Sequence, residues 1–353
     1  MVSVYDVAQR AGVSPATASR VLSGSSYPVR ARTRERVLRS AKILDFRPSM
    51  VARALVTART RTLGAIVHDV SDPYFGEVLR GLEGAAHANG YQMFVCSSNR
   101  ETQRELAYVR SLLSYRVDAI LFCGGGIDDR RYGTELRRLL DGYRKTGGAV
   151  VTLAPHGYRA PSVTADNRGG AVAMARHLLD LGHRRLGVVA GPASIRTGTV
   201  RVAGFRAALA ERGVALAPDL IVSGEFTAEG GAAAVSRLLD RDPAITAVLC
   251  ANDVMAFGVL HELAGRGIRV PQTVSVAGFG DVRMAAYTNP PLSTVAVPRY
   301  EIGWQGVHAA LALLAGEPVR SRRLPVSVVA RASTGRVPER TASGRREQRR
   351  RAG

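Results

Sequence analysis

The stretch YDVAQRAGVSPATASRVL, residues 5–22, decides the fold of the amino-terminal region. Apolar residues recur at helical spacing in its first half, and Gly12 can end that helix in the left-handed conformation. Ser14 can cap a second helix, and Pro15 suits the first turn of that helix. The pattern therefore predicts a helix, a tight turn and a second helix.

In a unit of this kind, the start of the second helix enters the major groove of DNA. Arg20 has the length and the planar fork to bind O6 and N7 of a guanine. The other residues expected to face DNA are Tyr5, Ser14, Pro15, Ala16, Thr17, Ser19 and Thr33. The alternative is a small helical bundle with incidental polar residues, and the charge of this region favours DNA over it.

Positive charge is concentrated at the two ends of the chain. Of the net charge of +20, residues 1–60 carry +8 and residues 331–353 carry +6, so the 270 residues between them carry only +6. This distribution indicates a polyanionic partner. A second interpretation is compositional drift, because Lys42 and Lys145 are the only lysines and arginine is used everywhere else.

Beyond the head, apolar runs alternate with amphipathic helical stretches, which predicts an α/β fold with parallel sheets. The predicted strands are Leu63–Val70, Tyr91–Ser97, Asp118–Cys123, Ala149–Leu153, Leu186–Ala190, Ile221–Val222, Ala247–Ala251 and Val274–Gly278. So many strands fit two doubly wound lobes better than one sheet. The predicted helices are Phe75–Asn89, Thr102–Tyr115, Gly170–Leu181, Val202–Arg212, Glu229–Asp240 and Asp253–Gly265.

The predicted domain division has four parts. They are a head of three short helices (1–46), a basic linker with helical spacing (47–61), a two-lobed core (62–336) and a basic disordered tail (337–353). We expect lobe 1 at about 62–163 and 293–322, and lobe 2 at about 164–292 and 323–336. The seam falls near residues 162–166, and the chain is expected to cross back at Asn289-Pro290-Pro291.

The head resembles that of the LacI/GalR family of bacterial transcription regulators, whose signature is similar to DVA..AGVS..TVSRVLN. This chain has Asp6-Val7-Ala8, Ala11-Gly12-Val13-Ser14 and Ser19-Arg20-Val21-Leu22. It departs from the signature at Ala18 and Ser23, where the family usually has Val and Asn. The resemblance assigns operator specificity to Pro15, Ala16 and Arg20.

The segment Pro48–Leu55 (PSMVARAL) resembles the hinge helix of that family. The resemblance implies that two such helices enter the minor groove, where Leu55 wedges between base pairs and Ser49 and Ala52 join the DNA-binding set. The alternative makes Leu55 an ordinary core residue. Because so short a helix is marginal by itself, we expect it to form only with DNA and a second subunit.

The resemblance continues to about residue 336 and implies a periplasmic-binding-protein-like core with a ligand cleft between its lobes. The resemblance rests on motifs that occur in the same order as in the family: Ser71–Phe75, Ala165–Gly170, Leu181–His183, Ala190–Pro192, Arg201–Phe205, Ala251–Asp253 and Pro290–Val295. The predicted effector-binding residues are Tyr74, Phe75, Thr197, Arg201, Phe226, Asn252 and Asp281. The alternatives are that Phe75 and Phe226 are core aromatics and that Arg201 forms a structural ion pair. Asp253 is interpreted as a helix cap.

Two positions depart from the sugar-binding members of the family. The late turn reads Gly278-Phe279-Gly280-Asp281, without the usual first aspartate, and Ala154 stands where a second aspartate is usual. We therefore expect an effector that depends less on paired hydroxyls than a sugar does, or an anion. Alternatively, His156 or Asp281 substitutes for the missing carboxylates.

Other classes of protein fit the sequence less well. A dinucleotide-dependent enzyme needs a glycine fingerprint after its first strand, and Gly124-Gly125-Gly126 is interpreted as a plain turn instead. A periplasmic solute-binding protein and a nonspecific nucleoid protein are the remaining alternatives.

We expect no cofactor, no metal and no membrane span, and we interpret Cys96, Cys123 and Cys250 as reduced core thiols. The first residues predict no secretory signal and hence a cytoplasmic location.

The prediction as a whole is a homodimeric regulator bound to a pseudo-palindromic double-stranded DNA operator, and the family resemblance implies that it is a repressor. A small-molecule effector, for example a sugar or a related metabolite, is expected to modulate that binding from the cleft.

Overall fold

The computed structural model describes residues 2–23, 27–46 and 59–337. By its contacts the chain forms two compact units, one holding residues 1–62 with 116–118 and the other holding the rest of the chain.

The described residues of the head form three helices, as expected: α1 (Val4–Ala11), α2 (Pro15–Leu22) and α3 (Ala31–Ile43). Ser3 and Asp6 form a capping box at the start of α1, and Gly12 ends that helix at a φ of 58°. Ser14 caps α2, accepting a hydrogen bond of 3.2 Å from the backbone N–H of Thr17. The buried core of the head consists of Val7, Ala8, Ala11, Ala18, Val21, Val37 and Ala41.

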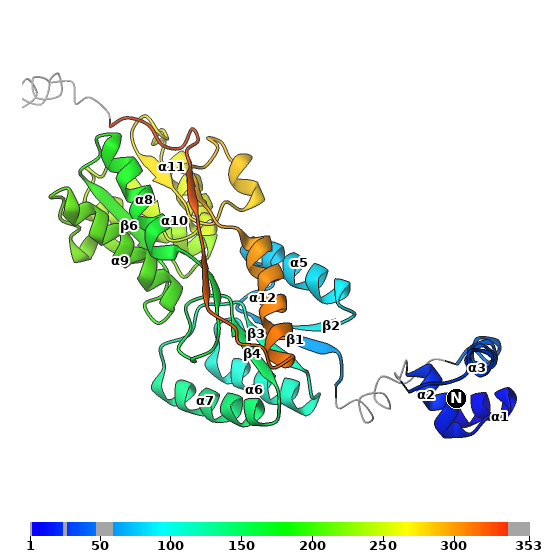
Figure 1. Ribbon diagram of the computed structural model, residues 1–353. Coiled ribbons are helices and arrows are strands. Elements are labelled where there is room, and N and C mark those ends of the chain that lie inside the picture. Colours follow the sequence, from blue (N-terminus) through cyan, green and yellow to red (C-terminus); the bar gives the residue numbers. More distant parts are fainter. Residues whose placement is uncertain (1, 24–26, 47–58, 338–353) are drawn as a thin grey trace, which may run out of the picture. The chain divides into compact units, whose positions relative to one another are not determined.

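The core contains two four-stranded sheets, and we name each lobe by its sheet (Figure 1). The sheet of lobe 1 has the order β2-β1-β3-β4, with β1 at Thr62–Val67, β2 at Gln92–Ser97, β3 at Ala119–Phe122 and β4 at Ala149–Thr152. The sheet of lobe 2 has the order β7-β6-β8-β9, with β6 at Leu186–Ala190, β7 at Ile221–Ser223, β8 at Ala247–Cys250 and β9 at Ser275–Ala277. The pairs β1–β3, β3–β4, β6–β7, β6–β8 and β8–β9 are all parallel. The expectation of two parallel-sheet lobes is confirmed.

Helices cover these sheets. Lobe 1 has α5 (Pro73–Ala88), α6 (Thr102–Ser114), α7 (Arg130–Lys145) and α12 (Arg299–Leu314). Lobe 2 has α8 (Asn167–Asp180), α9 (Arg196–Glu211), α10 (Ala228–Arg241) and α11 (Asp253–Gly265), with the short 3₁₀ helices η1 (Pro218–Leu220) and η2 (Arg283–Ala286). The sequence patterns predicted six of these α-helices and did not predict α7 or α12.

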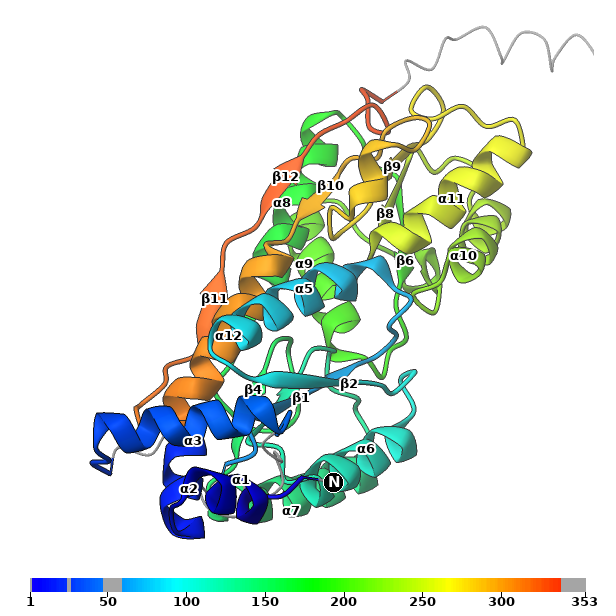
Figure 2. The ribbon, with the colours of Figure 1, turned by 90° about the vertical axis from the view of Figure 1, so that its right-hand side faces the viewer.

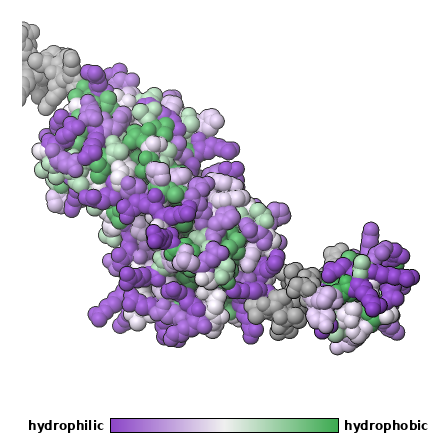
Figure 3. Space-filling view, in the orientation of Figure 1, coloured by the Kyte–Doolittle hydropathy of each residue, from purple (hydrophilic) through white to green (hydrophobic). Residues whose placement is uncertain are grey.

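Figure 3 shows hydrophilic residues over much of the visible face of the core.

Short strands join the two lobes. β5 (Val163–Ala165) pairs in parallel with β11 (Arg322–Leu324), and β10 (Thr294–Ala296) pairs antiparallel with β12 (Ser327–Val329). Figure 2 shows β11 and β12 running from beside α12 to beside α8. The backbone of residues 293–295 still bonds to Gly278 and Gly280, so the chain crosses back after β10, later than the expected Asn289-Pro290-Pro291.

Candidate functional site

The recognition face of the head lies on α2. Pro15, Ala16 and Arg20 are exposed there, whereas Ala18 and Val21 of the same helix are buried. The guanidinium carbon of Arg20 lies 4.2 Å from the ring centroid of Tyr27, so a cation–π contact orients this side chain.

The remaining predicted DNA-binding residues differ in position. Ser14 is exposed and its hydroxyl is engaged as the helix cap, while Thr17, Ser19 and Thr33 are half-buried. Tyr5 is exposed on α1. The hinge residues Ser49, Ala52 and Leu55 lie outside the described residues.

In the core, a cavity of about 60 Å³ opens where the parallel strands of both sheets end. His68 follows β1, Arg100 follows β2, Gly124 and Gly125 follow β3, and Ala154 follows β4. From lobe 2 the lining includes Ile195 after β6, Phe226 after β7, Asn252 after β8 and Phe279 after β9. The carboxyl ends of parallel strands are where open α/β sheets bind ligands.

Six of the seven predicted effector-binding residues line this cavity: Tyr74, Phe75, Thr197, Arg201, Phe226 and Asn252. Tyr74 and Phe75 lie at the start of α5 with their ring centroids 5.4 Å apart and nearly perpendicular. Phe226 faces Gly191 so closely that a Cβ there would lie 2.1 Å from its ring. Both phenylalanines are buried and line the cavity at once, so the two interpretations offered for them are compatible.

Arg201 is almost fully buried, with 4% of its surface exposed. Its Nε donates to Oδ1 of Asn167 at 2.9 Å, and its Nη1 donates to the carbonyl of Ala251 at 2.5 Å. The guanidinium lies 3.9 Å from the ring centroid of Phe279. Burial lowers the pKa of Arg201 to about 10, which leaves it charged at neutral pH. These contacts make Arg201 a fixed cation that holds lobe 2 segments together behind the cavity.

Asn252 and Asp253 differ from expectation in which of them caps α11. The carbonyl oxygen of the Asn252 side chain accepts from the backbone N–H of Met255, so Asn252, not Asp253, caps α11. The carboxylate of Asp253 accepts instead from the Thr294 hydroxyl and from the backbone N–H of Val282. Burial of this carboxyl raises its pKa to about 6.

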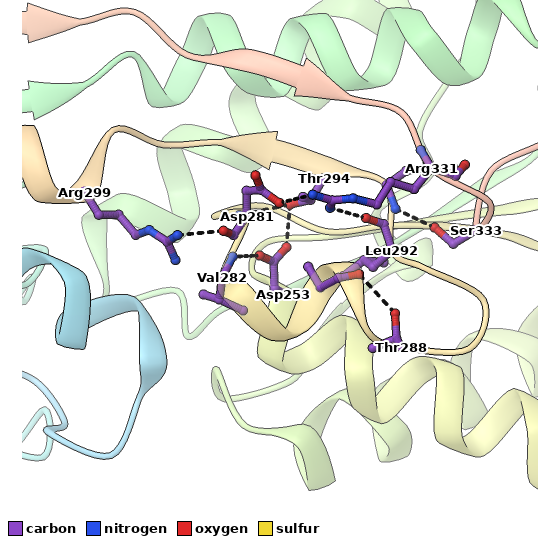
Figure 4. A network of polar contacts seen from close by, with 11 residues as sticks. Asp253, Asp281, Val282, Thr288, Leu292, Thr294, Arg299, Arg331 and Ser333 are labelled. Carbon is purple, nitrogen blue, oxygen red and sulfur yellow. Dashed lines mark hydrogen bonds and ion pairs between the residues drawn. The ribbon is translucent and has the colours of Figure 1, made fainter.

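Asp281 is the predicted effector residue that does not line the cavity. Its carboxylate forms an ion pair of 2.7 Å with Arg331, and its carbonyl accepts from Arg299 (Figure 4). Arg331 also donates to the carbonyl of Leu292 in the same network. This placement ties the turn after β9 to the carboxyl-terminal strap.

The turn at Gly280 explains one departure from the family pattern. Gly280 has a φ of 138°, a conformation that L side chains rarely adopt, and a Cβ there would lie 3.2 Å from the Asp253 carboxylate. An aspartate at this position would therefore require a different backbone. Ala154, the other departure, does line the cavity.

Sequence reasoning missed Arg100. This residue follows β2 and lines the cavity, with Nη2 3.9 Å from the Asp72 carboxylate and the guanidinium carbon 5.5 Å from the Phe226 ring centroid. Asn99 and Arg100 both have positive φ values, of 52° and 63°. Nothing in the local sequence signals this, because β2, β1 and β7 bring the contacts together only in the folded core.

Sequence reasoning also missed His68, Gly124 and Gly125. A Cβ at Gly124 would lie 2.5 Å from the His68 ring, and one at Gly125 would lie 2.3 Å from the Thr197 hydroxyl. The glycines therefore permit close approach at the cavity wall and are more than a plain turn. Burial lowers the pKa of His68 to about 3, and the nearby Arg100 and His156 contribute to that shift. His156 itself borders a separate pocket beside α7.

Among the residues that the structure describes, no group of three or more His, Cys, Asp or Glu is placed to hold a metal ion. Cys123 and Cys250 are buried, Cys96 is half-buried, and all three are unpaired thiols. In the described ranges no helix has the length and apolar character needed to span a bilayer.

Two family models match the chain. Residues 60–330 match periplasmic binding proteins and the sugar-binding domain of the LacI family, and residues 3–49 match bacterial regulatory proteins of the lacI family. The chain belongs to the lacI family of bacterial regulatory proteins. It is a DNA-binding transcription regulator with a periplasmic-binding-protein-like core.

Individual members of the lacI family are similar over most of the chain. The transcriptional repressor PurR of Proteus mirabilis is 34% identical over 306 residues, which cover 86% of this chain and 87% of PurR. The structure of a Lac repressor dimer bound to operator and the anti-inducer ONPF has a TM-score of 0.83 at 26% identity, covering 95% of this chain and 99% of that one. The complex of the regulator CelR with cellobiose has a TM-score of 0.69 at 31% identity, covering 94% of this chain and all of CelR.

Proposed function

We propose that this lacI-family protein is a repressor that binds a pseudo-palindromic operator as a homodimer and changes its affinity when an effector enters the core cavity. The observation that carries the proposal is the exposure of Pro15, Ala16 and Arg20 on one helix that is capped by Ser14. A helix presented in this way matches the geometry of major-groove readers. PurR is named a repressor and the Lac repressor structure is a dimer on its operator, which supports both parts of the proposal.

The proposed DNA-binding set keeps Tyr5, Ser14, Pro15, Ala16, Thr17, Ser19, Arg20 and Thr33 in the head, and Ser49, Ala52 and Leu55 in the linker. The proposed domain division remains a head at 1–46, a linker at 47–61, a core at 62–336 and a tail beyond it. We place the protein in the cytoplasm, where the chromosome lies, and we assign it binding without turnover.

The surface of the core offers apolar residues for a dimer interface. Phe94 and Val95 are exposed on β2, the edge strand of its sheet, and the exposed Tyr115, which follows α6, has its ring 5.6 Å from that of Phe94. Met284 and Tyr287 are exposed in lobe 2. Exposed apolar groups of this size favour an interface that water does not reach.

The proposed effector site consists of the cavity and the residues at its wall. A volume of about 60 Å³ is far below the roughly 300–1,000 Å³ of ordinary ligand sites, so entry of an effector requires the lobes to separate. That motion would change the spacing of the two linkers in a dimer and so couple the cavity to DNA, with a coupling of roughly 1–3 kcal/mol.

The test is selection of bound fragments from genomic DNA by the full-length chain, followed by footprinting. We expect one short pseudo-palindrome, bound by a dimer whose affinity falls steeply with salt. Equal binding to every duplex, or a monomeric complex that covers a single half-site, contradicts the proposal. Conversion of any bound ligand to product would place the chain among enzymes instead.

A further inference from the structure

The polar groups left over at the cavity wall are hydrogen-bond donors. Among the described residues, Arg100 Nε and the Thr197 hydroxyl are buried there without a protein partner. Asn252 adds its amide group, because its carbonyl oxygen is already engaged by the backbone N–H of Met255. Buried donors that lack partners are unfavourable, so a ligand that satisfies them gains affinity.

The acceptors at the wall are, by contrast, largely engaged. Both oxygens of Asp253 accept from protein groups, as does the side-chain carbonyl of Asn167. One oxygen of Asp72 accepts from the backbone N–H of Tyr74 at 2.9 Å. The second oxygen of Asp72 lies 3.9 Å from Arg100 Nη2, so unpartnered donors outnumber unpartnered carboxylate oxygens at this wall and favour a ligand that brings acceptors.

The chain holds Arg100 at this wall through its backbone. The loop after β2 is tied to the end of β1 by hydrogen bonds from Ser98 N–H to the Val67 carbonyl and from Asn99 N–H to the His68 carbonyl. Asn99 and Arg100 then adopt positive φ, a region unfavourable for residues other than glycine. The side chain of Arg100 is only 19% exposed, so its charge lies largely out of solvent.

The charges limit the ligand to a single negative charge. Arg201 is a buried cation close to Asp253 and Asp72, and Arg100 has Asp72 at 3.9 Å, too long for a hydrogen bond. A monoanion can occupy the donors of Arg100, whereas a dianion would bring a second charge against the Asp72 carboxylate. Apolar and aromatic residues make up much of the remaining wall, including Phe75, Phe226, Phe279 and Ile195.

We propose that the effector is an organic carboxylate with a compact, flat apolar body, and that Arg100 and Thr197 bind its carboxylate. Arg100 Nε and the Thr197 hydroxyl supply one donor each to the carboxylate oxygens, and the ring of Phe226, which lines the same cavity, contacts the apolar body. This inference rests on the proposed function, since it names the class of molecule that the cavity takes.

The experiment compares acids with their uncharged amides, which share size and shape. The probes are benzoate and benzamide, nicotinate and nicotinamide, and cinnamate and cinnamamide, with cellobiose as a neutral sugar. Binding to the full-length chain is measured by thermal shift and then by titration calorimetry. We expect at least one acid to bind about 10-fold or more tightly than its amide. A hydrogen bond to a charged group is stronger than one to a neutral group, and the difference lowers the dissociation constant by about tenfold or more.

Arg100→Met tests the assignment, with Arg104→Met as the matched control that removes the same charge from the exposed surface of α6. The acid preference should disappear in Arg100→Met and persist in Arg104→Met. Thr197→Val is the second variant, since the Thr197 hydroxyl bonds to no described protein group and its removal breaks no hydrogen bond within the described residues. It should weaken the acids several-fold, because the carboxylate loses one of its two proposed donors.

Several results would overturn the inference: amides that bind as well as their acids, cellobiose that binds more tightly than any acid, or an acid preference that survives in Arg100→Met. Absence of any acid-selective binding across the panel would overturn it as well. Operator preference is measured on the same preparations. If that preference is present and acid selectivity is absent, the carboxylate inference alone fails; if operator preference is absent, the proposed function fails.

Discussion

The recognition helix and the effector cavity achieve specificity in different ways. The head presents its main specificity residues at one helix, where Ser14, Pro15 and Arg20 lie within seven consecutive positions. The cavity draws its wall from the ends of strands in two sheets, with Arg100 and Phe226 more than a hundred residues apart. Residues on one helix share a face because of their spacing in the sequence. Residues from two sheets come together only when the sheets pack in the folded core.

The difference also appears in burial and charge. Arg20 is exposed and free to meet DNA, while Arg201 is buried and its donors satisfy Asn167 and Ala251. Arginine is therefore expected to contact DNA bases in the head, whereas in the core it is a buried structural cation. Substitutions in the two regions should separate function from stability.

The largest expected effect is at Arg201. Arg201→Met leaves two buried acceptors without a donor, so the free energy of unfolding of the core should fall by about 3–5 kcal/mol. Trp304, the one tryptophan of the chain, lies in α12 of the core and reports this transition in urea. Arg206→Met, on the exposed face of α9, is the control and should change stability by less than about 0.5 kcal/mol. Equal effects of the two variants would break the contrast.

The next largest expected effect is the loss of stability of the core on acidification. The pKa of His68 is lowered to about 3 in the folded core, so unfolding takes up a proton below the ordinary pKa of 6.5. Stability is therefore fully present above pH 6.5 and falls as the pH drops, by roughly 2–3 kcal/mol near pH 4.5 for this group. Asp253, whose pKa is raised to about 6, acts in the opposite direction, because its protonation favours the folded state.

The measurement for acidification is urea unfolding of wild type and His68→Asn from pH 7 to pH 4.5. The difference between them should change by the stated amount, since Asp253 and His156 are common to both. All seven histidines lie at or beyond residue 68, so the head has none to contribute. A difference that does not vary with pH would show that His68 is not buried in its neutral form.

In the head, Arg20→Ala should reduce discrimination between the selected operator and a scrambled duplex by about 1–3 kcal/mol. Arg10→Ala, exposed in the last turn of α1, removes the same charge and is the control. Both should weaken binding to the scrambled duplex alike. Binding assays at two salt concentrations check this, and retained discrimination in Arg20→Ala would refute the assignment of Arg20 to base readout.

The smallest effect concerns the cap of the recognition helix. Ser14→Ala removes the hydrogen bond to the Thr17 N–H and should destabilise the head by about 1 kcal/mol, while Ser14→Asp retains an acceptor. Amide hydrogen exchange in α1 and α2 is the readout. The urea transition of Trp304 should not move, and if it does, the head and the core do not unfold separately.

The elements of the fold were predictable where a periodic pattern extends over a full strand or helix. All eight predicted strands are present in the structure, with shifts at their ends. The three-residue strands β5, β10, β11 and β12 were not predicted, although β7 and β9, which have the same length, were. The helices α7 and α12 were missed.

Six of the seven residues predicted for the effector site line the cavity, because they follow strands or start helices in motifs that the sequence displays. Asp281 does not, because Arg331, fifty residues later, forms an ion pair with its carboxylate. The cap of α11 was assigned one residue too late, since Asn252 and Asp253 both suit a cap by type. The choice between them depends on Thr294 and Val282, which reach Asp253 only in the folded core.

The sequence by itself determined the head, because capping, turn formation and amphipathic spacing act between residues a few positions apart. It also determined the succession of strands and helices in the core, through hydrophobic periodicity. Only the tertiary structure decided which side chains share the cavity, which of their donors stay without partners and which arginine is fixed in the interior. Those properties depend on burial and on partners that are remote in sequence, and no local pattern encodes them.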